Sequence, residues 1–202
     1  MHKLSLPITL IFTVSLSAEP LIIQPGLPGA VSKEINSEEA INIANTGFTK
    51  DDTVFMNHMI VHHEQALTLS RLAPNRTNTQ EILDLAGRID VSQEDEISFM
   101  QGWLEERNIE VHTHMSMHHM KMMGMASDED IAKLSNSKGM EFDELFLRLM
   151  IAHHEGALDM VKELERQPGS SYDPLMFEFV SDLSNDQGVE IERMNTLLTG
   201  LS

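Results

Sequence analysis

An internal repeat constrains the fold of this chain more than any other feature of its sequence. Residues 55–69, FMNHMIVHHEQALTL, recur as residues 146–160, FLRLMIAHHEGALDM, at a constant offset of 91 residues. In both copies the matching apolar and His positions are spaced by four, three, four and three residues, as on one face of an α-helix. We expect these two helices to follow the capping residues Asp51 or Asp52 and Asp143, and to run until Pro74 and Pro168.

Each copy is followed by a second helical pattern, and these two patterns also resemble each other. Both carry a stripe of seven positions in which Gln, Glu and Met come in that order: Ile82, Ala86, Ile89, Gln93, Glu96, Met100 and Trp103, and Met176, Val180, Leu183, Gln187, Glu190, Met194 and Leu197. Four amphipathic helices in two hairpins with short loops are best buried as a four-helix bundle. No strand pattern competes, so the sequence predicts an all-α fold.

The bundle is expected over residues 51–202. It divides into a hairpin over 51–108, a long Met/His-rich connection over 109–140 and a second hairpin over 141–202. The connection contains one predicted short helix near residues 128–134, with Ser127 as its N-cap. Residues 18–50 contain Pro20, Pro25 and Pro28, and they predict an extended lead that could end in a short helix after Ser37.

The first 17 residues are predicted to be a signal peptide. Lys3 precedes an apolar run over residues 4–16, and Ser15 and Ser17 provide the small residues of a cleavage site. The run is shorter than the roughly 20 residues that cross a bilayer. We therefore expect a periplasmic or secreted protein that is free of the membrane after cleavage.

Composition restricts the classes of partner. Lys and Arg total 14 against 32 Asp and Glu, a formal charge of -18, which argues against nucleic acid and makes cations the natural counterpart. The sequence has no Cys, so it can form neither disulfides nor thiolate metal sites, and it suits an oxidising compartment.

Residues 112–125, HTHMSMHHMKMMGM, hold six Met and four His, whereas the other 188 residues hold nine Met and six His. Soft thioether sulfur and borderline imidazole nitrogen select Cu(I) over Ca2+ and Mg2+. The predicted ligands in this stretch are His112, His114, Met115, Met117, His118, His119, Met120, Met122, Met123 and Met125. The alternative is a Met-rich surface that binds partners by apolar contact.

A second group of candidate ligands lies on the repeated helices, where Met precedes a His pair by about one turn. Two pseudo-equivalent sites would be formed by Met59, His62, His63 and Met100, and by Met150, His153, His154 and Met194. Glu or Gln of the facing helix would bond the free side of an imidazole. His58 is a further candidate in the first copy. Alternatively, buried His and Glu satisfy each other while Met fills gaps in the core.

The repeated Met-Ile-x-His-His-Glu-x-Ala-Leu, with its downstream Gln, Glu and Met, resembles the ferritin-like family catalogued as domain of unknown function 305. The resemblance covers roughly residues 50–105 and 140–200. With its signal peptide and Met/His stretch, the chain is similar to the CopM-type periplasmic copper-resistance proteins. That resemblance implies an all-helical bundle that binds Cu(I), and also Cu(II), outside the cytoplasm and protects cells from excess copper.

The sequence thus favours an extracytoplasmic copper-binding protein without catalytic turnover. We expect it to prefer Cu(I), to accept Ag(I) and Cu(II), and to act in copper sequestration, transport or resistance. One alternative is a ferritin-like di-iron oxidase, but the Glu-x-x-His that such a site needs is missing from the sequence. Another is an interaction module that docks on an exported metal sensor or efflux protein.

Overall fold

The computed structural model describes residues 21–25, 31–44, 46–111 and 122–201. They belong to two compact units, Met1–Ala44 and Asn45–Ser202. The predicted signal peptide lies outside the described residues.

The first unit contains a small strand pair and a short helix. Strand β1 (Ile22–Gln24) pairs antiparallel with β2 (Lys33–Ile35), with Ile22 opposite Ile35. Helix α1 (Ser37–Ala44) follows. The expected helix after Ser37 is therefore present, and the two short strands lie in the segment that was expected to be extended. Three-residue strands are too short for an alternating apolar pattern to reveal them.

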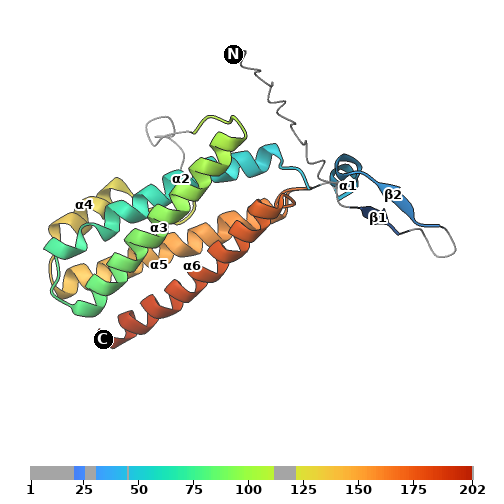
Figure 1. Ribbon diagram of the computed structural model, residues 1–202. Coiled ribbons are helices and arrows are strands. Elements are labelled where there is room, and N and C mark those ends of the chain that lie inside the picture. Colours follow the sequence, from blue (N-terminus) through green and yellow to red (C-terminus); the bar gives the residue numbers. More distant parts are fainter. Residues whose placement is uncertain (1–20, 26–30, 45, 112–121, 202) are drawn as a thin grey trace, which may run out of the picture. The chain divides into compact units, whose positions relative to one another are not determined.

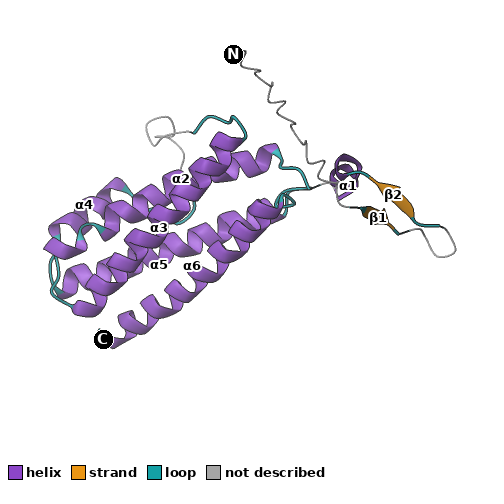
Figure 2. Ribbon diagram, viewed as in Figure 1, coloured by secondary structure: helices purple, strands orange, loops and turns teal. Residues whose placement is uncertain are grey.

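The second unit is a four-helix bundle, which confirms the predicted fold (Figures 1 and 2). Its long helices are α2 (Lys50–Ser70), α3 (Gln80–Glu106), α5 (Met140–Glu165) and α6 (Pro174–Gly200). Helices α2 and α3 form one hairpin, α5 and α6 form the other, and α2 packs on α5. The short helices are η1 (Ala73–Asn75) and α4 (Asp128–Asn136), and α4 packs on α5.

The predicted stripes of α3 and α6 face the core. In α3 the buried members include Ile82, Ile89 and Met100, and in α6 they include Met176 and Met194. The buried apolar side chains form two clusters, and removing them from water supplies the main driving force for folding.

The N-caps of the helices agree only in part with the capping residues predicted from the sequence. Ser127 caps α4 as expected, and its side chain accepts a hydrogen bond from the Asp130 N–H. The N-cap of α2, however, is Thr49, which forms a capping box with Asp52. Helix α5 begins after Gly139, whose φ of 57° favours glycine, so the assignment of Asp143 as the cap was wrong.

Asp52 and Asp143 also join the two hairpins. They occupy equivalent positions of the repeat, 91 residues apart. The Asp52 carboxylate accepts a hydrogen bond from the Ser171 N–H (2.8 Å), in the loop of the second hairpin. Asp143 accepts one from the Thr79 hydroxyl (2.5 Å), in the loop of the first. Each copy of the repeat thus stabilises the loop of the other copy.

Candidate functional site

The two copies of the repeat meet at the first histidine of each pair. The rings of His62 on α2 and His153 on α5 have centroids 3.8 Å apart and are tilted by 35°. The Nε2–H of His153 donates to the backbone carbonyl of His62 at 2.9 Å. Both side chains are buried, so a polar contact lies at the centre of the α2–α5 interface.

The second histidine of each pair faces a carboxyl group of the adjacent helix. His63 Nε2 lies 2.5 Å from a Glu96 oxygen, and His154 Nε2 lies 2.6 Å from a Glu190 oxygen. All four side chains are largely or fully buried. The expected bonding of imidazole by Glu is therefore present in both hairpins. The Gln93 side-chain amide, in contrast, is buried without a hydrogen bond among the described residues.

Burial keeps three of these histidines uncharged. It lowers the pKa of His62 and of His63 to about 3, and it also lowers the pKa of His153. Burial, helped by nearby Asp186 and Glu190, raises the pKa of Glu96 to about 8. Although the His63–Glu96 distance is that of an ion pair, these shifts favour an uncharged pair that shares one proton.

His62 also holds the end of the Met/His-rich connection. Its Nε2–H donates to the backbone carbonyl of Met123 at 3.0 Å. Three residues further along α2, the Gln65 amide pairs with the Ala126 backbone, through bonds of 2.7 Å and 3.0 Å. Residues 122–126, called the strap below, are therefore fixed to α2.

The strap is also pressed against α5, at Gly156. A Cβ on Gly156 would collide with the Met123 carbonyl and with the Cα of Gly124. Gly124 itself has a φ of 74°, and a Cβ there would collide with the Ala152 carbonyl. Only glycine permits this approach of two backbones.

Gln65 and Gly156 were not identified as site residues from the sequence. They are the same position of the repeat, since HHEQAL in one copy becomes HHEGAL in the other. One copy carries the side chain that binds the strap, and the other lacks the side chain that would exclude it. Within these six residues the two copies differ only at this position, and that difference is the sequence signal that could have revealed both residues.

The four methionines predicted as ligands in the bundle are all fully buried. Met59 and Met100 belong to one apolar cluster, whereas Met150 and Met194 belong to the other. Each pair lies on the two helices of one hairpin and shares one apolar cluster.

Two imidazoles of the bundle, those of His62 and His153, keep a nitrogen lone pair that could bind a metal ion. Every Nε2 has a partner, but the Nδ1 atoms of His62, His63, His153 and His154 are buried without one among the described residues. When Nε2–H donates to a carbonyl, as in His62 and His153, a neutral ring has its free lone pair on Nδ1. In the part of the chain that the structure describes, however, no three His, Asp or Glu side chains gather so that they could hold a metal ion.

Part of the predicted ligand set lies outside the described residues: His112, His114, Met115, Met117, His118, His119 and Met120. The other three predicted ligands of the connection are described. Met122 is buried, Met125 is half-buried and packs on the core, and Met123 is 44% exposed.

The helices of the described residues include none that is both long enough and apolar enough to cross a bilayer. Together the elements define a four-helix bundle made of two repeated hairpins, with buried His and Glu at the helix contacts. A family model described as "Domain of unknown function (DUF305)" matches residues 52–198, and the chain belongs to this family.

Solved structures of similar proteins share the fold. A DUF305 protein of Streptomyces coelicolor is 28% identical, with a TM-score of 0.66 over 75% of this chain and 93% of that one. A DUF305 fragment from Deinococcus radiodurans is 31% identical, with a TM-score of 0.65 over 75% of this chain and 97% of that one. CopM in its Cu(I)-bound form is 26% identical, with a TM-score of 0.59 over 74% of this chain and 96% of CopM. CopM in its Cu(II)-bound form is 28% identical, with a TM-score of 0.60 over 75% of this chain and 97% of CopM.

An uncharacterized protein of Acanthamoeba polyphaga mimivirus is 42% identical over 60 residues. This match covers 30% of the present chain and 40% of the viral protein.

Proposed function

We propose that this protein is exported and binds copper, with a preference for Cu(I), and that it acts in copper sequestration, transport or resistance. The observation that carries the proposal is the Met/His stretch of residues 112–125, whose end is fixed to the α2–α5 interface. A feature selected only for solubility would need neither its thioethers nor a built attachment.

Chemistry and relatives support copper in particular. Thioether and imidazole donors favour Cu(I) and its soft analogue Ag(I), and imidazole also accepts Cu(II). CopM, which has this fold and is 26–28% identical, has been solved with Cu(I) and with Cu(II) bound. The formal charge of -18 adds a general attraction for cations.

The test is competition for Cu(I) between the purified protein and a chromogenic chelator. We expect uptake of more than one Cu(I), and a lower count when the six connection methionines are replaced by Leu: Met115, Met117, Met120, Met122, Met123 and Met125. Replacement of the exposed Met140 and the buried Met176 by Leu is the matched control and should leave the count unchanged. Absence of any uptake would overturn the proposal.

The bundle is a second candidate copper site, supported by the buried Nδ1 atoms of His62 and His153, which have no hydrogen bond among the described residues. Met→Leu conserves volume in a core, so Met59→Leu and Met150→Leu remove sulfur with little change in packing. If the bundle binds copper, these variants lower the uptake that remains in the six-Leu protein. Unchanged uptake would assign the bundle histidines to structure alone.

A carrier must also pass its copper to another protein, and an exported metal sensor or efflux component is the class of partner we propose. Pull-downs from an extracytoplasmic extract, with and without copper, should recover different partners. Aerobic oxidation of ferrous iron with consumption of oxygen would instead support the di-iron oxidase.

A further inference from the structure

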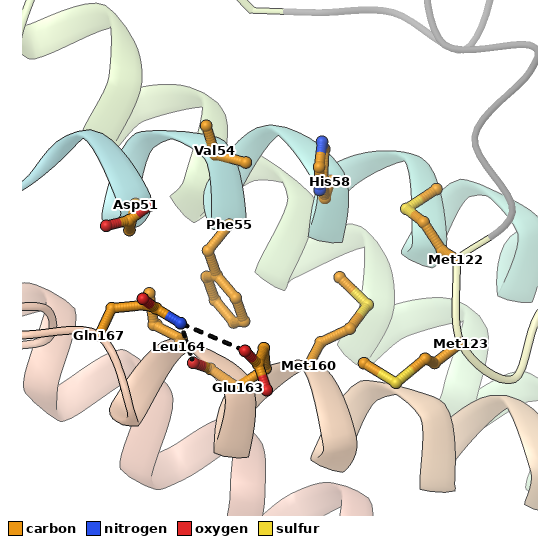
Figure 3. A pocket seen from close by; sticks show the side chains of 10 residues that line it. All are labelled: Asp51, Val54, Phe55, His58, Met122, Met123, Met160, Glu163, Leu164 and Gln167. Carbon is orange, nitrogen blue, oxygen red and sulfur yellow. Dashed lines mark hydrogen bonds between the residues drawn. The ribbon is translucent and has the colours of Figure 1, made fainter.

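A pocket of about 320 Å3 lies beside the strap, between α2 and α5. Figure 3 labels four residues that line it: Met122 and Met123 on the strap, Met160 on α5 and His58 on α2. Met122 and Met160 are 8% and 9% exposed, so their sulfur atoms are largely shielded, whereas Met123 is 44% exposed. Three thioethers and one imidazole thus line one small space that solvent reaches past Met123.

The backbone of the strap is held by contacts at Met123 and at the residues that follow it. His62 holds the Met123 carbonyl, Gln65 holds Ala126, and Gly156 allows the backbone to approach α5. Donor groups that are already placed in the free protein lose less conformational entropy when a ligand binds. The pocket is therefore a built feature of the bundle surface.

The repeat shows that these donors are specific to this side of the bundle. At the offset of 91 residues, His58 corresponds to Leu149, and Met160 corresponds to Leu69. In the copies of these two positions that do not face the strap, the residue is thus an apolar Leu. Sulfur and nitrogen replace it only where Met122 and Met123 lie opposite.

The carboxylates of the pocket have a different role. Glu163 accepts hydrogen bonds from Arg166 (3.0 Å) and from the Gln167 amide (3.2 Å), so its oxygens are engaged, and Asp51 lies in the first turn of α2. These acidic groups make the pocket attractive to a cation, while the sulfur and nitrogen atoms on its other side are soft or borderline ligands.

We infer that Met122, Met123, Met160 and His58 form a binding site for one soft monovalent cation, Cu(I) or Ag(I). The inference rests on the proposed copper-binding function and adds a defined site at the anchored end of the connection. Three sulfurs and one nitrogen can supply the four donors of a tetrahedral site. No residue of the 112–121 stretch is needed for it.

The competing explanation is that Met160 only fills space in the apolar cluster to which it belongs. Met160→Leu separates the two explanations, because it keeps the volume and removes the sulfur. Met176→Leu is the matched control, since Met176 is a buried member of the same cluster but does not line the pocket.

The experiment is a titration of the purified protein with Ag(I), with the methionine methyl groups labelled with carbon-13 and observed by NMR. We expect the methyl resonances of Met122, Met123 and Met160 to shift together, and that of Met176 to stay in place. In Met160→Leu and in His58→Leu, the affinity of one site should fall by about tenfold or more, while the other sites are retained.

The outcomes separate this inference from the proposed function. If Ag(I) binds, but the Met160 resonance does not move and Met160→Leu binds like the unaltered protein, the pocket site is refuted and copper binding by the connection stands. If neither Ag(I) nor Cu(I) binds at all, the proposed function fails and the pocket site fails with it.

Discussion

His62 and His153 stack with their ring centroids 3.8 Å apart, and the Nε2–H of His153 donates to the backbone carbonyl of His62. The two residues are equivalent positions of the internal repeat. The copies therefore join through a buried pair of imidazoles, at a place where most bundles have only apolar side chains. Because charged imidazole tolerates burial poorly, this contact links the stability of the fold to pH.

Copper-free protein should lose stability as the pH falls below about 6.5. His62 and His63 have a folded-state pKa of about 3 against 6.5 for an exposed ring, so between these values only the unfolded chain takes up their protons. The loss is on the order of 1 kcal/mol per pH unit for each buried ring. Glu96 acts in the opposite direction, but it is one group against these two rings and His153, whose pKa is also lowered. Urea unfolding at pH 7 and pH 5 measures the difference, and equal stabilities would contradict a neutral buried cluster.

Glu96→Gln should change the alkaline side of the pH profile. The raised pKa of Glu96, about 8 against 4.5, means that its contribution to stability is present below pH 4.5 and is lost as the pH rises through 8. Gln cannot ionise. Relative to the unaltered protein, the variant should therefore gain on the order of 1–3 kcal/mol between pH 5 and pH 9. Glu105→Gln, at an exposed position of the same helix, should show no such trend.

Gly156→Ala should displace the strap. The added Cβ would collide with the Met123 carbonyl, and we expect a loss of about 1–3 kcal/mol in the free energy of unfolding. It should also weaken Ag(I) binding in the adjacent pocket. Gly188→Ala is the control, because nothing lies within 4 Å of a Cβ built there and the residue is inside α6. That variant should gain about 0.5–1 kcal/mol. If both variants gained stability, the close approach of the strap would be refuted.

Asp173→Asn should weaken the contact between α3 and the start of α6. The Asp173 carboxylate accepts hydrogen bonds from the Met176 N–H (3.0 Å) and from Arg107 (2.9 Å), and the Arg107 guanidinium lies 4.1 Å from the Trp103 ring. Asn keeps the helix cap but loses the ion pair, which should cost about 1–3 kcal/mol. Thermal unfolding measures the loss. Asp159→Asn, in the exposed pair with Lys162, should have little effect, and a similar drop in both would argue against a specific role.

The bundle could be predicted from sequence because its signals are repeated and local. The spacing of apolar residues on four helices gave the fold, and Ser127 was recognised as a cap because the whole capping motif lies within four residues. The pairing of His63 with Glu96 could be anticipated for the same reason, since the same order of residues occurs twice.

The remaining features depend on contacts that sequence periodicity does not encode. Nothing in the spacing of residues indicates that His62 binds the Met123 carbonyl, since that carbonyl belongs to a connection 61 residues away. Helical spacing indicates only that Met160 belongs to one face of its helix, because its neighbours in the pocket come from the strap. Gly139 starts α5 through a backbone conformation with φ of 57°, which a search for Ser, Thr, Asp or Asn caps does not detect.

The exchange of Gln65 for Gly156 explains why the two hairpins belong in one polypeptide. Two identical hairpins related by symmetry would offer Gln on both sides of their interface or Gly on both sides. A single crossing segment needs one partner that binds it and one that makes room for it. Because both copies lie in one chain, the two halves can differ at that position, and the near-symmetric bundle has one distinguishable face.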